Sequence, residues 1–206
     1  MHVHLRPIHS ALVLLHAARP RLPMTLRHLL FLVLAAGVSA DANADIHAAI
    51  NEGNFDAFKS ALSAGADLNA RAAQAGMQTP LMHAVLGGQD QMVEHLLGID
   101  GVDVTVPEQD GYTPMHGAGF QGRAAIARML VAHGVSATDV HKDGYQPIHR
   151  ACWGREQRHA DTVAALIEAG VDPGVKSESG MACADMTQNE ATRAALRAAT
   201  DAKKEL

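Results

Sequence analysis

The chain has 206 residues, of which 48% are hydrophobic and 19% are charged, and its formal net charge at pH 7 is −5. This hydrophobic fraction agrees with a folded core and argues against intrinsic disorder. The acidic balance disfavours nucleic acids and anionic membrane surfaces as partners, because both repel a negatively charged protein.

The N-terminal segment differs in composition from the rest of the chain. It has four arginines, no acidic residue before Asp41, and an unbroken apolar run over residues 29–38 that is followed by small residues. A short positive region, an apolar core and small residues at cleavage spacing are typical of a secretory signal peptide. The sequence therefore predicts a targeting leader over residues 1–44, with Met24 as a more compact start, and one domain over residues 45–206. Without the leader the formal charge is −8, because the leader holds four arginines and one aspartate.

The leader has two alternative interpretations. A membrane anchor over residues 11–38 is interrupted by Arg19, Pro20, Arg21 and Pro23, and the apolar run itself is shorter than the ~20 residues that cross a bilayer. We therefore expect no stable membrane insertion. An organelle transit peptide is also rich in arginine and poor in acidic residues, and it would place the protein in a mitochondrion or plastid. We favour the secretory pathway, either the endoplasmic reticulum lumen or secretion.

Residues 45–69 carry the first helical pattern of the domain. Phe55, Phe58 and Leu62 lie at helical spacing between Gly53 and Gly65, which predicts an antiparallel helix pair. The segment lacks the proline start of the segments that follow it.

Three central segments repeat one pattern. Thr79-Pro80, Thr113-Pro114 and Gln146-Pro147 begin these segments, at intervals of 34 and 33 residues. Proline suits the first turn of a helix, since its missing amide donor would be unpaired there, and the residue before it can cap the helix. Apolar stripes and later glycines predict a pair of helices in each segment. A helix pair of this size cannot bury its own apolar face, so neighbouring segments must stack into a solenoid.

The three central motifs resemble the ankyrin repeat, most closely at residues 79–81, 113–116 and 146–149. The resemblance extends over residues 45–199. It implies an all-α ankyrin-repeat solenoid of about five helix-turn-helix units, with three clear central repeats between an N-terminal and a C-terminal cap. The C-terminal cap is expected where residues 180–185 replace the usual motif and a helix follows over residues 190–204.

The last four residues, 203–206, read Lys-Lys-Glu-Leu. They resemble the Lys-Asp-Glu-Leu retrieval signal, which a receptor recognises in the secretory pathway. After a signal peptide, this ending predicts residence in the endoplasmic reticulum. The alternative is a charged helix end that matches the signal by chance.

The resemblance also implies where a partner would bind. In ankyrin proteins the turn tips and the end of the first helix form the concave surface that grips another protein. Four aromatic residues occupy such positions, and three basic residues follow the last of them; the expected partner-binding residues are Tyr112, Phe120, Tyr145, Trp153, Arg155, Arg158 and His159. Aromatic and arginine side chains are common anchors of protein interfaces. The alternative is that the rings are wedged between stacked repeats.

We expect a non-catalytic scaffold or adaptor, acting as a monomer, with no metal and no cofactor. His149 and Cys152 lie three residues apart on one predicted helix, but no orienting third group accompanies them. Two other interpretations stay open: an organellar or cytosolic ankyrin adaptor without a true leader, and a zinc protein that uses His133, His141 or His159 near Cys152.

The chain has only two cysteines, Cys152 and Cys183, in adjacent predicted repeats. No disulfide framework can therefore hold the fold together. A single bridge is feasible in an oxidising lumen, but we favour two free, mostly buried thiols.

Overall fold

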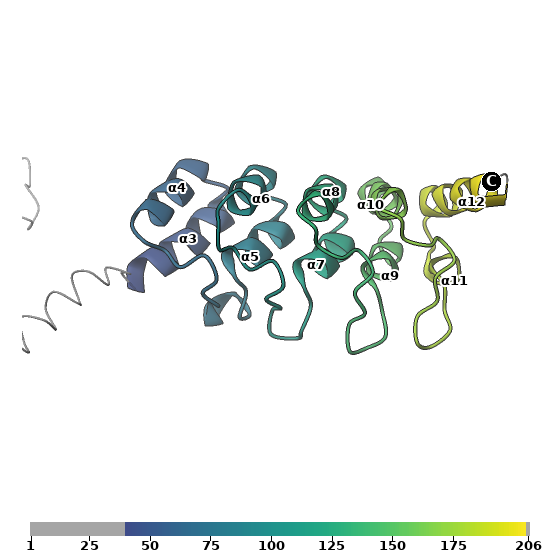
Figure 1. The fold of residues 1–206 in the computed structure, drawn as a ribbon, viewed down its shortest axis with the longest axis horizontal. Helices are drawn as coiled ribbons and strands as arrows, with labels where there is room; N and C mark the ends of the chain where they lie inside the picture. Colours follow the sequence, from purple (N-terminus) through teal and green to yellow (C-terminus); the bar gives the residue numbers. More distant parts are fainter. Residues whose placement is uncertain (1–39, 205–206) are drawn as a thin grey trace, which may run out of the picture. The chain divides into compact units, whose positions relative to one another are not determined.

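The structure is a computed structural model that describes residues 40–204, and these residues form a row of stacked helix pairs (Figure 1). Over the described range there is no β-strand, only two isolated bridges, between Ala72 and Gln78 and between Lys176 and Ala182. The helices are α3 (Ala40–Glu52), α4 (Phe55–Ser63), the 3₁₀ helix η1 (Ala73–Ala75), α5 (Pro80–Gly87), α6 (Asp90–Leu97), α7 (Pro114–Gln121), α8 (Ala124–Ala132), α9 (Pro147–Cys152), α10 (Gln157–Glu168), α11 (Cys183–Met186) and α12 (Glu190–Lys204).

The first helix of each central repeat begins at its predicted proline, and in α5 the preceding threonine also caps the helix. Pro80 is the first residue of α5, and the Thr79 hydroxyl accepts a hydrogen bond from the Met82 amide at 3.2 Å. This bond satisfies one of the amide donors that a helix start leaves unpaired. The helix ends at Gly88, whose φ of 69° lies in the left-handed region that favours glycine.

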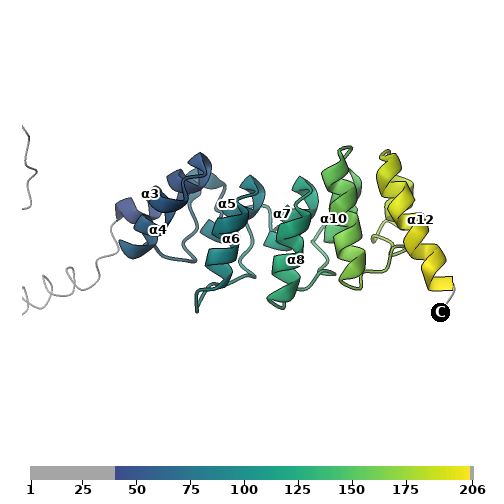
Figure 2. The same cartoon turned by 90° about the horizontal axis from the view of Figure 1, so that it is seen from above.

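The helices form two layers (Figure 1). Helices α3, α5, α7, α9 and α11 follow one another in one layer, and α4, α6, α8, α10 and α12 follow one another in the other. Seen from above, the second layer lies over the first as a series of roughly parallel helices (Figure 2). Each helix pair packs mainly against the pairs next to it, as expected for a solenoid.

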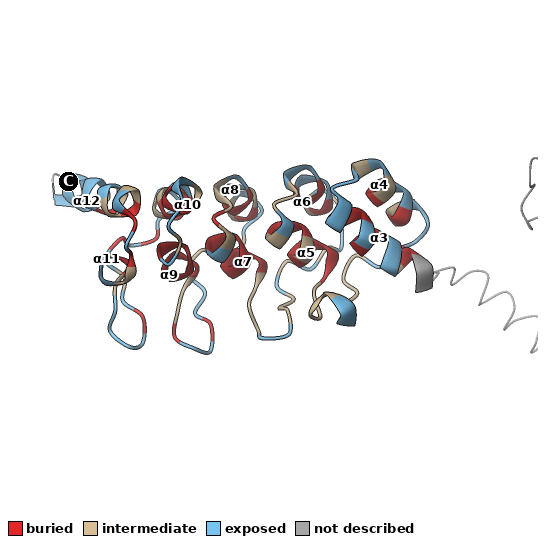
Figure 3. Ribbon diagram, turned by 180° about the vertical axis from the view of Figure 1, so that it is seen from behind, coloured by how far each residue is buried: buried red, intermediate tan, exposed pale blue. Residues whose placement is uncertain are grey.

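The core runs through the whole row between the two layers. Buried residues lie on the facing sides of the helices, while the outer side of the second layer is mostly exposed (Figure 3). The largest buried side chains come from the N-terminal cap and the three central repeats; they include Ile50, Phe58, Leu81, Leu96, Met115, Ile126, Leu130, Ile148 and Leu166. The C-terminal cap adds Cys183 and Leu196 to the core. This continuous core confirms that the repeats bury their apolar faces against one another.

The predicted all-α solenoid with two caps is confirmed, with one difference at its start. Helix α3 begins at Ala40, so residues 40–44 of the expected leader are helical. Ala42 is buried against the first repeat, and the Asn43 side chain accepts a hydrogen bond from the Asp67 amide at 2.7 Å. The rest of the predicted leader, residues 1–39, lies outside the described residues, as do Glu205 and Leu206 of the predicted retrieval signal.

The expectation of two free thiols is wrong. Cys152 at the end of α9 and Cys183 at the start of α11 form a disulfide, with their α carbons 5.5 Å apart. Both residues are fully buried in the junction between the fourth repeat and the C-terminal cap. The α-carbon separation is in the normal range for a disulfide, because stacking places α11 beside α9 and turns the two side chains toward each other.

Candidate functional site

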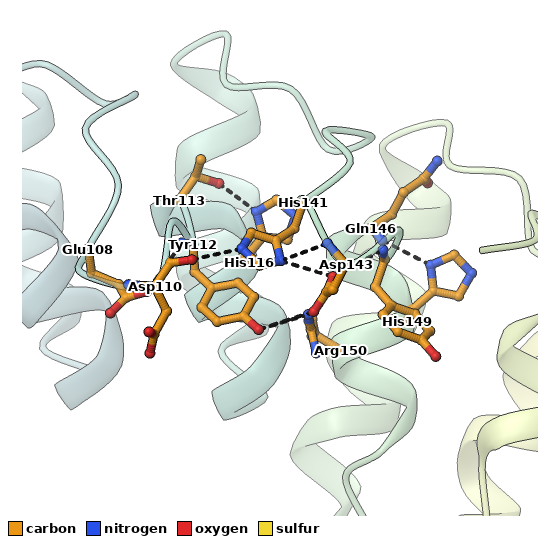
Figure 4. A network of polar contacts seen from close by, with 11 residues as sticks. Glu108, Asp110, Tyr112, Thr113, His116, His141, Asp143, Gln146, His149 and Arg150 are labelled. Carbon is orange, nitrogen blue, oxygen red and sulfur yellow. Dashed lines mark hydrogen bonds and ion pairs between the residues drawn. The ribbon is translucent and has the colours of Figure 1, made fainter. Parts of the chain in front are cut away.

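Arg150, in α9, lies at the centre of a network of polar contacts (Figure 4). Its guanidinium carbon lies 4.7 Å from the centre of the Tyr112 ring, 5.2 Å from that of Tyr145 and 4.6 Å from that of Trp153. A guanidinium at such distances is attracted to the faces of aromatic rings. Arg150 is only 5% exposed. Its contacts with three rings from two repeats hold these rings in place.

Asp143 neutralises Arg150 from the loop before α9. An Arg150 Nη2 atom donates to the Asp143 carboxylate and, at 3.0 Å, to the Tyr112 hydroxyl, which itself donates to Asp143 at 3.2 Å. Burial alone would raise the pKa of Asp143, but hydrogen bonds from His141 and Arg150 and the charge of Arg150 hold it well below its usual range. Asp143 is therefore ionised at neutral pH, and its negative charge cancels the positive charge of Arg150.

His141 joins the loops of two neighbouring repeats. Its ring stacks on Tyr112 with the ring centres 3.9 Å apart, and its Nε2 lies 3.0 Å from the Asp110 carbonyl oxygen. On the other side its Nδ1 lies 2.9 Å from Asp143 Oδ1. The contacts fix the tips of the 101–113 and 133–146 loops relative to each other, so the surface above them is preorganised.

The four aromatic residues predicted to bind a partner are at least partly exposed. Phe120 is 55% exposed and Trp153 is 42% exposed, while Tyr112 and Tyr145 are half-buried. Tyr145 and Trp153 pack edge to face with their ring centres 5.3 Å apart. The alternative in which all four rings are wedged between repeats is thereby excluded.

A cavity of about 360 Å³ opens on the same face, between α5 and α7. Apolar atoms dominate its lining. The lining residues are Met82, Leu86, Glu108, Tyr112, His116, Gly117, Phe120, Gln121 and Arg150. This cavity and the Arg150 cluster share Tyr112, so they form one continuous surface.

Comparison with known protein families gives a direct assignment. A family model described as Ankyrin repeats (3 copies) matches residues 46–141 and, in an overlapping match, residues 81–177. The two matches together span more than half of the chain. The chain belongs to the ankyrin repeat family. A comparison with curated proteins returned no match.

Two of the three basic residues predicted for the ankyrin binding face lie at the surface. Arg155 is exposed, and no aspartate or glutamate pairs with it over residues 40–204. Arg158 is half-buried and donates to Glu156 at 2.8 Å. His159 is only 6% exposed, because its ring packs beside Gly122 and Gly154. It supports the loop and is not available to a partner.

His149, a histidine of the ankyrin motif, ties its repeat to the next one. His149 accepts a hydrogen bond from the Gln146 amide at 3.0 Å, and its Nε2 lies 3.1 Å from the Val175 carbonyl oxygen in the next repeat. Burial lowers the pKa of both His116 and His149. Each ring is therefore neutral at pH 7.

The nucleophile pair considered from sequence does not exist in the folded protein. Cys152 is bonded to Cys183, and His149 is engaged by Gln146 and Val175. Within residues 40–204, no three side chains of the His, Cys, Asp or Glu type come close enough together to hold a metal ion. Over the same residues, no helix is both long and apolar enough to cross a bilayer.

Sequence reasoning missed the central role of Arg150. The residue follows the motif histidine of its repeat, a position that faces the loop tips. A signal was present, since Arg150 is flanked in the repeat frame by Tyr145 and Trp153, and Tyr112 lies at the equivalent position of Tyr145 in the preceding repeat. The pairing with Asp143 depends on the loop conformation, which the sequence alone did not reveal.

Proposed function

We propose that this protein is a non-catalytic adaptor that binds another protein through the face formed by α5, α7, α9 and their connecting loops. We call this surface the loop-side face, and it corresponds to the concave face of ankyrin-repeat proteins. The proposal extends the family assignment, since ankyrin repeats support protein–protein interaction. The observation that carries it is the exposure of Phe120 and Trp153 beside a rigid cluster centred on Arg150.

The physical basis is the low entropic cost of using this surface. Tyr112 and Tyr145 are held by Arg150 and His141 before any partner arrives. Side chains that are already ordered lose little conformational freedom on binding, and large aromatic rings offer much apolar area. Phe120, Tyr145 and Trp153 are the proposed anchors, and Arg155 and Arg158 supply charge at the edge.

The adaptor role is tested by removing the three proposed anchors. We expect the triple variant Phe120→Ala, Tyr145→Ala, Trp153→Ala to lose the partners that the wild-type protein captures. The matched control is Arg128→Ala in α8, an exposed residue of the other layer whose ion pair with Glu168 is solvent-exposed. Circular dichroism would confirm that both variants fold. Undiminished capture by the triple variant would refute the proposed face.

We further propose that the protein acts in an oxidising compartment of the secretory pathway. Two features support this location: the leader-like composition before residue 40 and the buried disulfide between Cys152 and Cys183. Disulfides persist in such compartments and are rare in the cytosol. The organellar alternative predicts a different processing site and a different compartment.

Two measurements test the location. Mass spectrometry of the mature protein should find an N-terminus close to Asp41, because cleavage further on would remove residues that α3 uses. An intact Met1 or Met24 would refute the leader. Fusion of residues 201–206 to a secreted reporter should retain it in the cell, and full secretion would refute the retrieval signal.

A further inference from the structure

The cavity on the loop-side face is lined by Gly117, a glycine in α7. In successive repeats the residue after Met82, His116 and His149 is His83, Gly117 and Arg150, respectively. Gly117 therefore stands where its neighbours carry large side chains. An added Cβ at Gly117 would lie 3.1 Å from Met82 Cε and 3.2 Å from Leu86 Cδ2, so these two side chains close the floor of the hollow.

The size and lining of the hollow suit one apolar side chain. Met82, Leu86 and Phe120 supply apolar walls to a volume of about 360 Å³. This volume is at the lower end of the range for ligand pockets. It is large enough for a leucine, methionine or phenylalanine side chain, and burial of such a side chain in a pocket is the usual form of an interface hot spot.

The rim of the hollow is acidic. Glu108 Oε1 accepts hydrogen bonds from the amides of Asp110 at 2.9 Å and Tyr112 at 3.2 Å, which fixes its carboxylate at the edge of the cavity. Figure 4 shows Glu108 and Asp110 together on the side of Tyr112 away from Arg150. Within the described chain, neither acid forms an ion pair with a lysine or arginine.

Among the described residues that line the hollow, the one cation, Arg150, is already neutralised. Arg150 is paired with Asp143, donates to the Tyr112 hydroxyl and packs on three aromatic rings. The charge of Arg150 is therefore not available to a ligand. The carboxylates of Glu108 and Asp110 are available, because neither is paired with a lysine or arginine of the described chain. The electrostatic complement of this rim is a positive side chain.

We propose that the hollow binds a peptide segment of the partner protein that inserts one leucine, methionine or phenylalanine beside a lysine or arginine. The apolar side chain fills the space over Gly117, and the basic side chain lies against Glu108 and Asp110. This inference rests on the proposed adaptor function and specifies the chemistry that the partner presents. The acidic rim excludes segments that carry aspartate or glutamate next to the apolar residue.

A random dodecapeptide library displayed on phage, selected on the purified mature protein, tests the proposal. We expect enriched peptides to share an apolar residue with lysine or arginine within two positions. A synthetic peptide of the enriched sequence should lose affinity by at least tenfold when its apolar residue is changed to serine, and its affinity should fall with added salt. Enrichment of acidic or wholly polar peptides, or of none, would overturn the proposal.

Two variants separate the two parts of the site. Gly117→Leu fills the hollow and should weaken the peptide at least tenfold. Glu108→Gln keeps the acceptor oxygen for the Asp110 and Tyr112 amides, so it should weaken the basic peptide severalfold and leave a lysine-to-glutamine peptide unchanged. Phe120→Ala alters the exposed wall of the hollow and should also weaken binding of the peptide. This loss of affinity does not depend on packing at Gly117. Unchanged affinity in Gly117→Leu and Phe120→Ala would overturn the proposal.

The same peptide distinguishes failure of this inference from failure of the adaptor face. Peptide binding that survives Gly117→Leu but is lost in Tyr145→Ala, Trp153→Ala would refute the hollow and leave the loop-side face in use. Peptide binding that survives all of these variants would refute both proposals. Loss in Gly117→Leu with unchanged circular dichroism and thermal unfolding supports the inference.

Discussion

Reduction of the Cys152–Cys183 disulfide should destabilise the C-terminal end of the solenoid. The two cysteines are 31 residues apart in sequence, and cross-linking a loop of this length lowers the entropy of the unfolded chain by an amount worth about 3.7 kcal/mol at 25 °C. For a domain of this size, that loss lowers the midpoint of thermal unfolding by roughly 7–15 °C. Because each repeat contacts mainly its neighbours, the loss should be concentrated in α9, α10, α11 and α12.

The assay compares oxidised protein with protein that has been unfolded in reductant and refolded. Urea unfolding followed by circular dichroism gives the free energy difference, and hydrogen exchange locates it. Exchange should accelerate over residues 147–204 and stay unchanged over α3 and α4. The double variant Cys152→Ala, Cys183→Ala is the control, since its stability must not depend on reductant. Equal stability of the oxidised and reduced wild type would refute the reasoning.

Three further perturbations have distinct expected outcomes. Burial and the charge of His83 lower the pKa of His47 to about 4. Because the pKa of His47 in the unfolded chain is higher, its contribution to the free energy of unfolding is complete above about pH 6.5 and is lost as pH falls toward 4, by about 1–2 kcal/mol after allowance for solvent screening. Urea unfolding of His47→Gln should therefore show a weaker pH dependence than that of the wild type. Asp143→Asn should lower the free energy of unfolding by about 1.5–3 kcal/mol, since Arg150 loses its charged partner. A double-mutant cycle with Arg150→Met should find positive coupling, whereas additive losses of stability would contradict the pairing. Gly119→Ala should destabilise the protein by about 1–3 kcal/mol because its Cβ would meet the Pro147 carbonyl oxygen. Gly117→Ala should be tolerated because its Cβ would meet only flexible side-chain ends. Equal thermal unfolding midpoints of the two variants would contradict this packing.

The architecture could be predicted from sequence because each repeat encodes it locally. The proline starts of α5, α7 and α9, the glycines after them and the period of 33–34 residues all specify the same helix pair. Agreement between local signals and the stacked arrangement made the interpretation robust. The sequence did not indicate the start of α3, because residues 40–44 are small and small residues suit a cleavage site and a helix equally well.

For the proposed site, the sequence predicted exposure only where position within the repeat decides it. Phe120 and Trp153 are exposed at the ends of α7 and α9, as the repeat frame indicated. His159 was misassigned because the insertion after Trp153 folds its side chain against Gly154, which no repeat position specifies. The sequence left a Cys152–Cys183 bridge feasible but favoured free thiols for a similar reason, since the meeting of the two cysteines depends on how the atypical cap stacks.

Site-specific photo-crosslinking tests the central claim most directly. A benzophenone amino acid replaces Phe120 on the loop-side face or, as the matched control, the exposed Ala125 in α8 of the other layer. In cells that make the protein, the adaptor proposal predicts a discrete protein adduct from position 120 and none from position 125. The proposed hollow further predicts that Gly117→Leu abolishes the adduct from position 120. Equal adducts from both positions, or adducts from position 125 alone, would contradict binding through the loop-side face.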